Sequence, residues 1–120
     1  MADRARHREI VDAFLAASRG GDFAGLVALL DPQAVVRADA AAIGVGATAA
    51  VRGAQAVAET FSGRAKGARP ATIGAEPGAV WAPGGKPRIA FAFTIVDGLI
   101  TAIDLLADPE RLASAVILRV

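Results

Sequence analysis

The sequence contains no cysteine and no tyrosine, and it has a single histidine, His7, and a single tryptophan, Trp81. Without cysteine the chain cannot form disulfides, thiolate metal sites or a cysteine nucleophile. His7 lies among Arg4, Arg6 and Arg8 near an expected helix start, which indicates a solvated face. Because no helical carboxylate accompanies this histidine at metal-ligand spacing, we expect neither a metal site nor another cofactor.

An excess of charge of one sign is also missing. Thirteen Lys and Arg residues face 12 Asp and Glu residues, for a net charge of +1, far from the concentrated basic field of nucleic-acid-binding proteins. No run approaches the ~20 apolar residues of a membrane span or the apolar core of a signal peptide. We therefore expect a cytoplasmic protein with no direct nucleic-acid partner and no membrane contact. A length of 120 residues, 54% of them hydrophobic, suits a single domain with a sizeable core.

The strongest structural signal is a predicted hairpin in the second half of the chain. Two long apolar runs, Ile89–Val96 and residues 99–107, are joined by Asp97-Gly98. Such a turn needs positive φ, which glycine adopts without steric cost. The first run alternates large side chains with small ones: Ile89, Phe91, Phe93 and Ile95 against Ala90 and Ala92. The strand therefore has a bulky face, which lines a packed or hollow interior, and a slim face.

Helices are predicted before the sheet. Three of them are expected, one from an Asp3 cap to Gly20-Gly21, one from an Asp22 cap to Asp31-Pro32 with Phe23 facing inward, and one over residues 53–66. Asp108-Pro109-Glu110 is a further helix start, with a capping aspartate and proline at the first helical position. Short strands are expected at residues 34–38, 71–76 and 79–82, the last two around a Pro77-Gly78 turn. Residues 40–50, small and apolar, are interpreted as a loop rather than a mobile lid.

This order predicts an α+β cone in which three N-terminal helices pack on a strongly bent mixed or antiparallel sheet, with one short helix at the C-terminus. The expected core is Ile10, Phe14, Leu26, Leu30, Val36, Val57, Phe61, Trp81, Ile89, Phe91, Phe93, Ile95, Ile103 and Leu105.

Five segments together resemble the nuclear transport factor 2-like superfamily, whose fold is cystatin-like: residues 7–17, 21–23, 29–32, 80–85 and 103–112. Within it the chain is similar to the SnoaL-like subgroup, and most closely to the domain at the C-terminus of certain extracytoplasmic-function sigma factors of actinobacteria. The resemblance implies one SnoaL-like domain over residues 1–120. It also implies a homodimer, since the slim face would allow close sheet-to-sheet approach.

Two departures from the sigma-factor pattern stand out. Those domains usually show Asp-Gly-Gly-Gly where this chain has Asp39 followed by three alanines, and Asn-Pro-Asp-Lys-Leu where it has residues 108–112. The DNA-binding sigma helices have no counterpart here. The chain is therefore interpreted either as a detached regulatory domain or as a free-standing relative.

Asp39 and Asp104 are the candidate catalytic carboxylates. Asp39 follows a strand, close to where the resembling ketosteroid isomerases place their proton-abstracting carboxylate, and burial at the rim of an apolar cone would raise its pKa. The favoured interpretation of Asp39 is nevertheless a strand-end aspartate that caps the following loop. Asp104 could correspond to the acid or base of SnoaL-type polyketide cyclases, but a mid-strand carboxylate needs a partner. A structural ion pair with Arg37 or Arg88 is the favoured interpretation.

The resembling isomerases also use a tyrosine from the first helix and a protonated aspartate from a late strand to stabilise the oxyanion. Here Phe14 takes the first place and Phe91 or Ala92 the second. The expected pocket is thus apolar, and its lining residues are Phe14, Arg37, Phe61, Trp81, Phe91 and Phe93. Trp81 either packs in the core or stacks on a flat ligand.

Two functions follow from these observations. The favoured one is a non-catalytic regulatory or small-ligand-binding domain, linked to sigma-factor control of transcription, with an apolar ligand and a sigma-factor or RNA polymerase contact as its expected partners. The alternative is a polyketide cyclase- or ketosteroid isomerase-like enzyme that acts on an apolar ketone with Asp39 or Asp104 as base.

Overall fold

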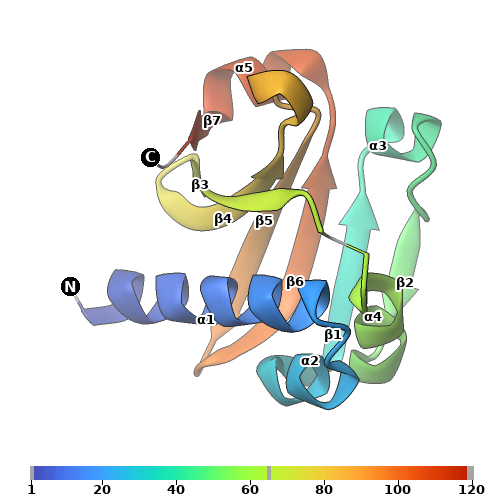
Figure 1. Cartoon of the computed structure of the whole chain (residues 1–120), viewed down its shortest axis with the longest axis vertical. Coiled ribbons are helices and arrows are strands. Elements are labelled where there is room, and N and C mark those ends of the chain that lie inside the picture. The colour runs from blue at the N-terminus through green and yellow to red at the C-terminus, as the bar shows by residue number, and fades with distance from the viewer. Residues whose placement is uncertain (1, 65, 119–120) are drawn as a thin grey trace.

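The structure, a computed structural model, describes residues 2–64 and 66–118 (Figure 1). The helices are α1 (Ala2–Arg19), α2 (Phe23–Leu29), α3 (Ala40–Gly44), α4 (Ala54–Phe61) and α5 (Pro109–Ala115), with one short 3-10 turn, η1 (Pro83–Gly85). The strands are β1 (Leu30–Ala38), β2 (Ala50–Arg52), β3 (Ala68–Ile73), β4 (Glu76–Trp81), β5 (Ile89–Val96), β6 (Leu99–Leu106) and β7 (Val116–Leu118). The α+β class is confirmed.

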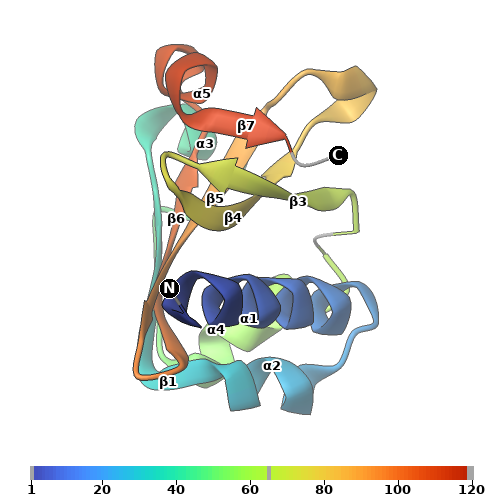
Figure 2. The same ribbon diagram turned by 90° about the vertical axis from the view of Figure 1, so that its left-hand side faces the viewer.

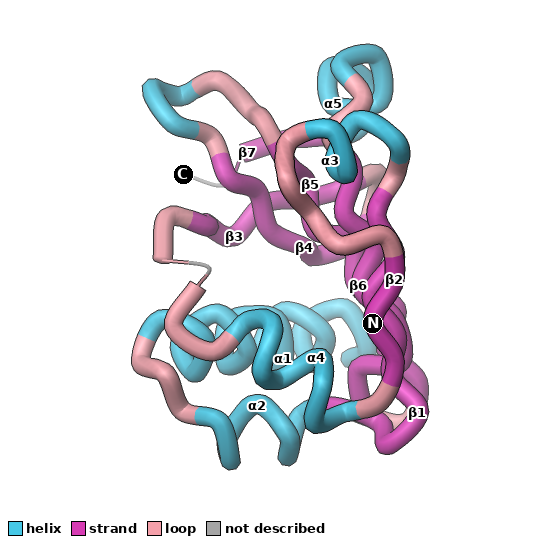
Figure 3. The backbone as a smooth tube through the Cα atoms, turned by 90° about the vertical axis from the view of Figure 1, so that its right-hand side faces the viewer, coloured by secondary structure: helices cyan, strands magenta, loops and turns pink. Residues whose placement is uncertain are grey.

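The strands form one mixed sheet in the order β2-β1-β6-β5-β4-β3-β7. The β1–β6 pair is parallel and the other neighbours are antiparallel. In Figure 2, β1 and β6 run upright while β3, β4 and β7 turn across them, so the sheet is strongly bent. Figure 3 shows α1, α2 and α4 together on one side of this bend, whereas α3 and α5 lie at the opposite end of the molecule. The predicted cone, helices against a curved sheet, is thereby confirmed.

The predicted hairpin forms β5 and β6. Val96 is paired with Leu99, and both turn residues have positive φ, 52° at Asp97 and 81° at Gly98. A register shift after Thr94 changes which side chains face the helices, so that Ile100 and Ile103 are both buried in the main core. The alternation of large and small side chains along β5 therefore sets its bulky and slim faces. The register shift in the β5–β6 pair then places the large side chains of β6 on the same side as the bulky face of β5.

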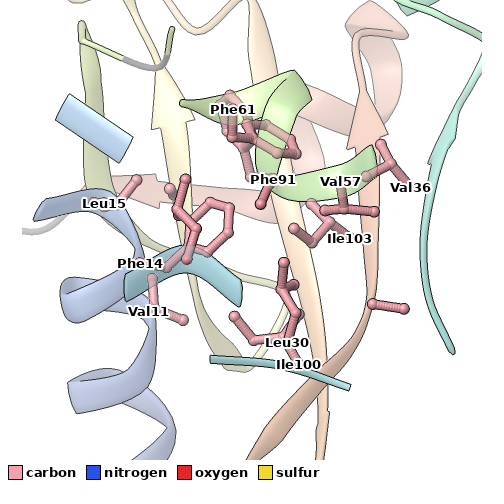
Figure 4. Packing of buried hydrophobic residues seen from close by; sticks show 14 of the residues in the cluster. Val11, Phe14, Leu15, Leu30, Val36, Val57, Phe61, Phe91, Ile100 and Ile103 are labelled. Carbon is pink, nitrogen blue, oxygen red and sulfur yellow. The ribbon is translucent and has the colours of Figure 1, made fainter. Parts of the chain in front are cut away.

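The main core lies between the helices and the concave face of the sheet (Figure 4). Its largest fully buried side chains include Phe14 and Leu15 from α1, Leu26 from α2, and Ile103 from β6. Two side chains expected to face inward lie on the surface instead. Phe23 is 39% exposed and Trp81 is 43% exposed, because each stands at the edge of an element, where few neighbours can cover a large side chain.

A second, smaller cluster lies on the slim face of β5. It comprises Ala71, Ile73, Val80, Ala90 and Leu112. Ala90 is only 1% exposed within one chain, because Leu112 of α5 packs over this face. The region of small residues that we expected to serve dimerisation is thus partly covered by the chain itself. A homodimer stays a prediction.

Several element boundaries differ from the predicted ones. α1 begins at Ala2, so Asp3 lies inside the helix and is not its cap, and α4 ends at Phe61 rather than at residue 66. α2 ends at Leu29, and β1 already begins at Leu30. The register of β1 against β6 shifts between Leu30 and Val35. Pro32, predicted to end the second helix, lies in this irregular stretch of β1. Because proline lacks an N–H, it is tolerated in a strand where the regular pairing is interrupted.

The segment expected as a loop, residues 40–50, contains helix α3 and the first residue of β2. The prediction was wrong for α3 because Asp39 caps a run of alanines, the best helix former.

The turn between β3 and β4 was also predicted at the wrong glycine. It lies at Gly74-Ala75, where Gly74 has φ of +64°, and Gly78 is inside β4. A Cβ added at Gly78 would stand 2.6 Å from both Ile73 Cγ1 and the Phe91 carbonyl oxygen. Gly78 is therefore needed for close approach of neighbouring strands, not for a turn.

Candidate functional site

Asp39 lies where β1 ends, and its carboxylate joins three segments. Oδ1 accepts a hydrogen bond from the Ala42 N–H (2.8 Å), which caps α3. The Ala107 N–H donates to both carboxylate oxygens (3.2 and 3.0 Å), and the Asp108 N–H donates to Oδ2 (3.2 Å). The Asp39 N–H itself donates to the Leu105 carbonyl (3.0 Å). One side chain thus ties the start of α3 to the segment that leads into α5.

These donors decide the ionisation of Asp39. Burial raises the pKa of its carboxyl group, but hydrogen bonds from the Ala42, Asp108 and Ala107 N–H groups, with the charge of Arg111, outweigh it and lower the pKa below its ordinary value. Hydrogen bonds to the charged form favour that form. The expectation of a raised pKa was therefore wrong. The carboxylate is a poor proton acceptor, and its oxygens are directed at backbone donors.

Asp104 forms an ion pair with Arg37, as the favoured interpretation predicted. The two residues are cross-strand neighbours on β1 and β6. Nε of Arg37 lies 2.8 Å from Oδ1 and Nη2 lies 3.0 Å from Oδ2. The hydrogen bond and charge of Asp104 raise the pKa of the Arg37 guanidinium. The side chains are 59% and 31% exposed, on the face of the sheet opposite the neighbouring buried Val36 and Ile103.

The expected pocket lining is mostly packed core. Phe14 contacts Phe61 and Phe93 edge to face, with ring centroids 5.2 and 5.4 Å apart, and Phe61 lies 6.3 Å from Phe91. Phe14 is 1% exposed, and Figure 4 shows the rings of Phe14, Phe61 and Phe91 together in the core. The four phenylalanines fill the interior of the cone with their own side chains. Arg37 lies on the other face of the sheet. Trp81 borders a pocket that is lined by described residues.

That pocket is a half-open hollow of about 760 Å³, here called the Trp81 pocket. α3, the connection from β4 to β5, and the start of α5 form its walls. The lining includes Val45, Trp81, Lys86, Arg88, Pro109 and Leu112. A second, more open groove of about 650 Å³ lies between α2, β1 and α4, with Val27, Pro32, Arg52, Gln55 and Glu59 among its lining residues.

No family model matches the chain, and no curated protein matches its sequence. Among solved structures, the extracytoplasmic function sigma factor SigJ of Mycobacterium tuberculosis is 26% identical with a TM-score of 0.67, over 89% of this chain and 44% of the sigma factor. A putative polyketide cyclase from Sinorhizobium meliloti is 24% identical (TM-score 0.56; 81% and 93% covered). An NTF-2 like protein of unknown function from Burkholderia xenovorans is 17% identical (TM-score 0.59; 97% and 96% covered). The chain has the nuclear transport factor 2-like fold.

The chain spans less than half the length of SigJ. In this nuclear transport factor 2-like fold, the two segments that depart from the sigma-factor pattern lie together. Asp39 precedes the three alanines, and its carboxylate binds the N–H of Asp108, the first residue of the second segment. The sequence placed these segments far apart, and only the parallel pairing of β1 with β6 brings their ends to one place.

Sequence reasoning missed two features of this nuclear transport factor 2-like chain. Lys86 and Arg88 line the Trp81 pocket, and their short spacing from the only tryptophan was the available signal. Ser18, fully buried, donates a 2.6 Å hydrogen bond to the Phe61 carbonyl and so ties α1 to α4.

The described residues offer neither a metal-binding group nor a membrane-spanning helix. In this part of the chain, no three His, Cys, Asp or Glu side chains are grouped so that they could hold a metal ion. No helix in it has both the length and the apolar character needed to cross a membrane.

Proposed function

We propose that the chain is a non-catalytic SnoaL-like regulatory and small-ligand-binding domain linked to sigma-factor control of transcription. The likeness to SigJ, at 26% identity over 89% of this chain, supports the link to sigma factors. The cytoplasm is the compartment that this role requires.

The observation that carries the non-catalytic part is the state of Asp39. A general base works best with a pKa near the operating pH and with a free oxygen directed at the substrate. The pKa of Asp39 is lowered instead, and both oxygens accept backbone hydrogen bonds. The other half of an isomerase site, oxyanion donors in the cone, also lacks support, since phenylalanines pack the interior and the sequence has no tyrosine.

The likeness to the putative polyketide cyclase extends to the fold alone. We therefore do not propose the enzyme with Asp39 or Asp104 as base. Exchange of each aspartate for asparagine would test that alternative on an apolar ketone: loss of turnover in either variant would revive it, and turnover that survives both changes would rule out these two bases.

The regulatory part is tested with purified protein. The chain is titrated calorimetrically against the portion of SigJ that it does not match, and then added to transcription reactions with RNA polymerase and that portion. We expect saturable binding and a changed transcript yield. Absence of both at tens of micromolar would remove the regulatory function. The mass of the chain in solution at micromolar concentration, measured in parallel, tests the homodimer, and a monomeric mass would contradict it.

A further inference from the structure

The Trp81 pocket lies outside the packed interior of the cone. Its volume of about 760 Å³ falls within the roughly 300–1,000 Å³ of small-molecule sites. Two apolar side chains at it are unusually open to solvent, Trp81 at 43% and Val45 at 69%. Exposed apolar side chains gathered around a hollow are typical of a surface that a ligand covers.

The indole of Trp81 is held in place. A Cβ at Gly67 would lie 3.1 Å from both Cδ1 and Nε1 of the ring, so this edge of the indole rests against the Gly67 backbone. The Trp81 carbonyl also accepts a 2.8 Å hydrogen bond from the Arg88 N–H. An aromatic ring fixed at one edge and open toward a hollow offers a flat surface for stacking at little entropic cost.

Two cations border the same hollow. Lys86 and Arg88 both line it and are both exposed, and no acidic side chain is among its lining residues in the described part of the chain. In that part of the chain, neither cation takes part in an ion pair. The carboxylate of Asp108 accepts a hydrogen bond from the Arg111 N–H (3.1 Å) and does not line the hollow. The lining of the pocket therefore combines an aromatic wall with two positive charges and no carboxylate.

Asp39 fixes the spacing of the remaining walls. Val45 follows α3, while Pro109 and Leu112 belong to α5. The carboxylate of Asp39 binds N–H groups at the start of α3 and just before α5 without itself lining the hollow. A site whose walls are held open before binding loses less entropy when it is filled.

We propose that the Trp81 pocket binds a flat apolar carboxylate, whose ring system stacks on Trp81 and whose carboxylate group pairs with Arg88 and Lys86. Arg88 is the main partner, because the planar guanidinium matches a carboxylate with two parallel hydrogen bonds. This inference rests on the ligand-binding half of the proposed function and names the chemical class of the ligand. It does not depend on the sigma-factor contact.

The test uses the fluorescence emission of Trp81. Because the sequence contains no other tryptophan and no tyrosine, this emission reports on Trp81. The chain is titrated with naphthoate and, separately, with the neutral naphthamide. We expect naphthoate to quench the emission saturably, and to bind about tenfold more tightly than naphthamide, the factor expected for one charge-assisted pair worth about 1.4 kcal/mol.

Variants separate the charge from the shape of the pocket. Arg88→Gln should weaken naphthoate about tenfold and leave naphthamide unchanged, whereas the matched control Arg52→Gln, an exposed arginine of β2, should change neither. Ala113→Phe should fill the hollow from α5 and abolish binding of both probes. Circular dichroism confirms that each variant is folded.

Equal binding of the two probes, or naphthoate binding unaffected by Arg88→Gln or by Ala113→Phe, would overturn the proposal. Loss of sigma-factor binding in Ala113→Phe, without any naphthoate binding to the parent chain, would overturn it in favour of a protein docking site. Because the titration contains no sigma factor, the probes can bind even where the regulatory function fails, and the two failures are distinguishable.

Discussion

Replacement of Asp39 by alanine is expected to destabilise the fold far more than loss of an ordinary helix cap. The variant loses the cap of α3, worth about 1 kcal/mol. It also loses the acceptor of the Ala107 and Asp108 N–H groups, each worth about 1.5 kcal/mol for a bond to a charged group. These sum to about 4 kcal/mol, and since Asp39 is only partly buried and water can reach some donors, we expect about 3 kcal/mol.

Asp22 provides a matched control. It caps α2 with one 2.9 Å hydrogen bond from the Gly25 N–H and is exposed. Asp22→Ala should cost about 1 kcal/mol. Urea denaturation followed by circular dichroism gives the free energy of unfolding of both variants, and Trp81 fluorescence reports the region near α5. The two variants are compared by how much free energy of unfolding each loses relative to the parent chain. If these losses differ by less than about 0.5 kcal/mol, which is within the error of independent measurements, the reasoning that Asp39 ties α3 to α5 is refuted.

The lowered pKa of Asp39 also sets a pH dependence. The group has a lower pKa in the folded state than its ordinary value of 3.8. Its contribution to stability is therefore fully present above about pH 4 and is lost as the pH falls through the folded-state pKa. We expect the free energy of unfolding of Asp39→Asn to fall less than that of the parent chain between about pH 5 and pH 2.5. Parallel pH profiles for the two proteins would contradict this.

The remaining predictions concern the interior, one strand and the ion pair, all measured by urea denaturation. Phe14→Tyr places a hydroxyl in a fully buried position and should cost about 1–3 kcal/mol, and an unchanged stability would indicate a wet cavity instead. Gly78→Ala should cost about 2 kcal/mol because the strands crowd its Cβ, whereas Gly44→Ala, with open space around it, should be neutral or slightly stabilising. A double-mutant cycle with Arg37→Gln and Asp104→Asn should give a coupling below about 1 kcal/mol, because both side chains are substantially exposed.

The features predicted well from the sequence are those with a local cause. Asp97-Gly98 adopts the positive φ that closes the hairpin, and Asp22 caps α2 through its own side chain. The alternation along β5 likewise separates the main core from the second cluster. In each case the residues that determine the structure are neighbours in the chain, so that sterics and spacing are sufficient.

The errors at residues 40–50 and at Pro77-Gly78 have a different origin. Alanine favours a helix only weakly without a cap, and the cap of α3 depends on where β1 ends. A glycine next to a proline is typical of a turn, but Gly78 is required because Phe91 and Ile73 approach it from other strands. Contacts between strands override such local preferences.

The sequence by itself determined the α+β order, the main hairpin, the apolar interior and a set of carboxylates to consider. Only the tertiary structure decided what those carboxylates do. Of the donors that lower the pKa of Asp39, Ala42 is a close neighbour in the chain, whereas Asp108 and Ala107 reach it through the β1–β6 pairing. Tertiary packing also fills the cone with phenylalanines and leaves Trp81 beside Arg88 at an open hollow. Ionisation and pocket shape depend on groups distant in sequence, and the folded chain alone sets their distances.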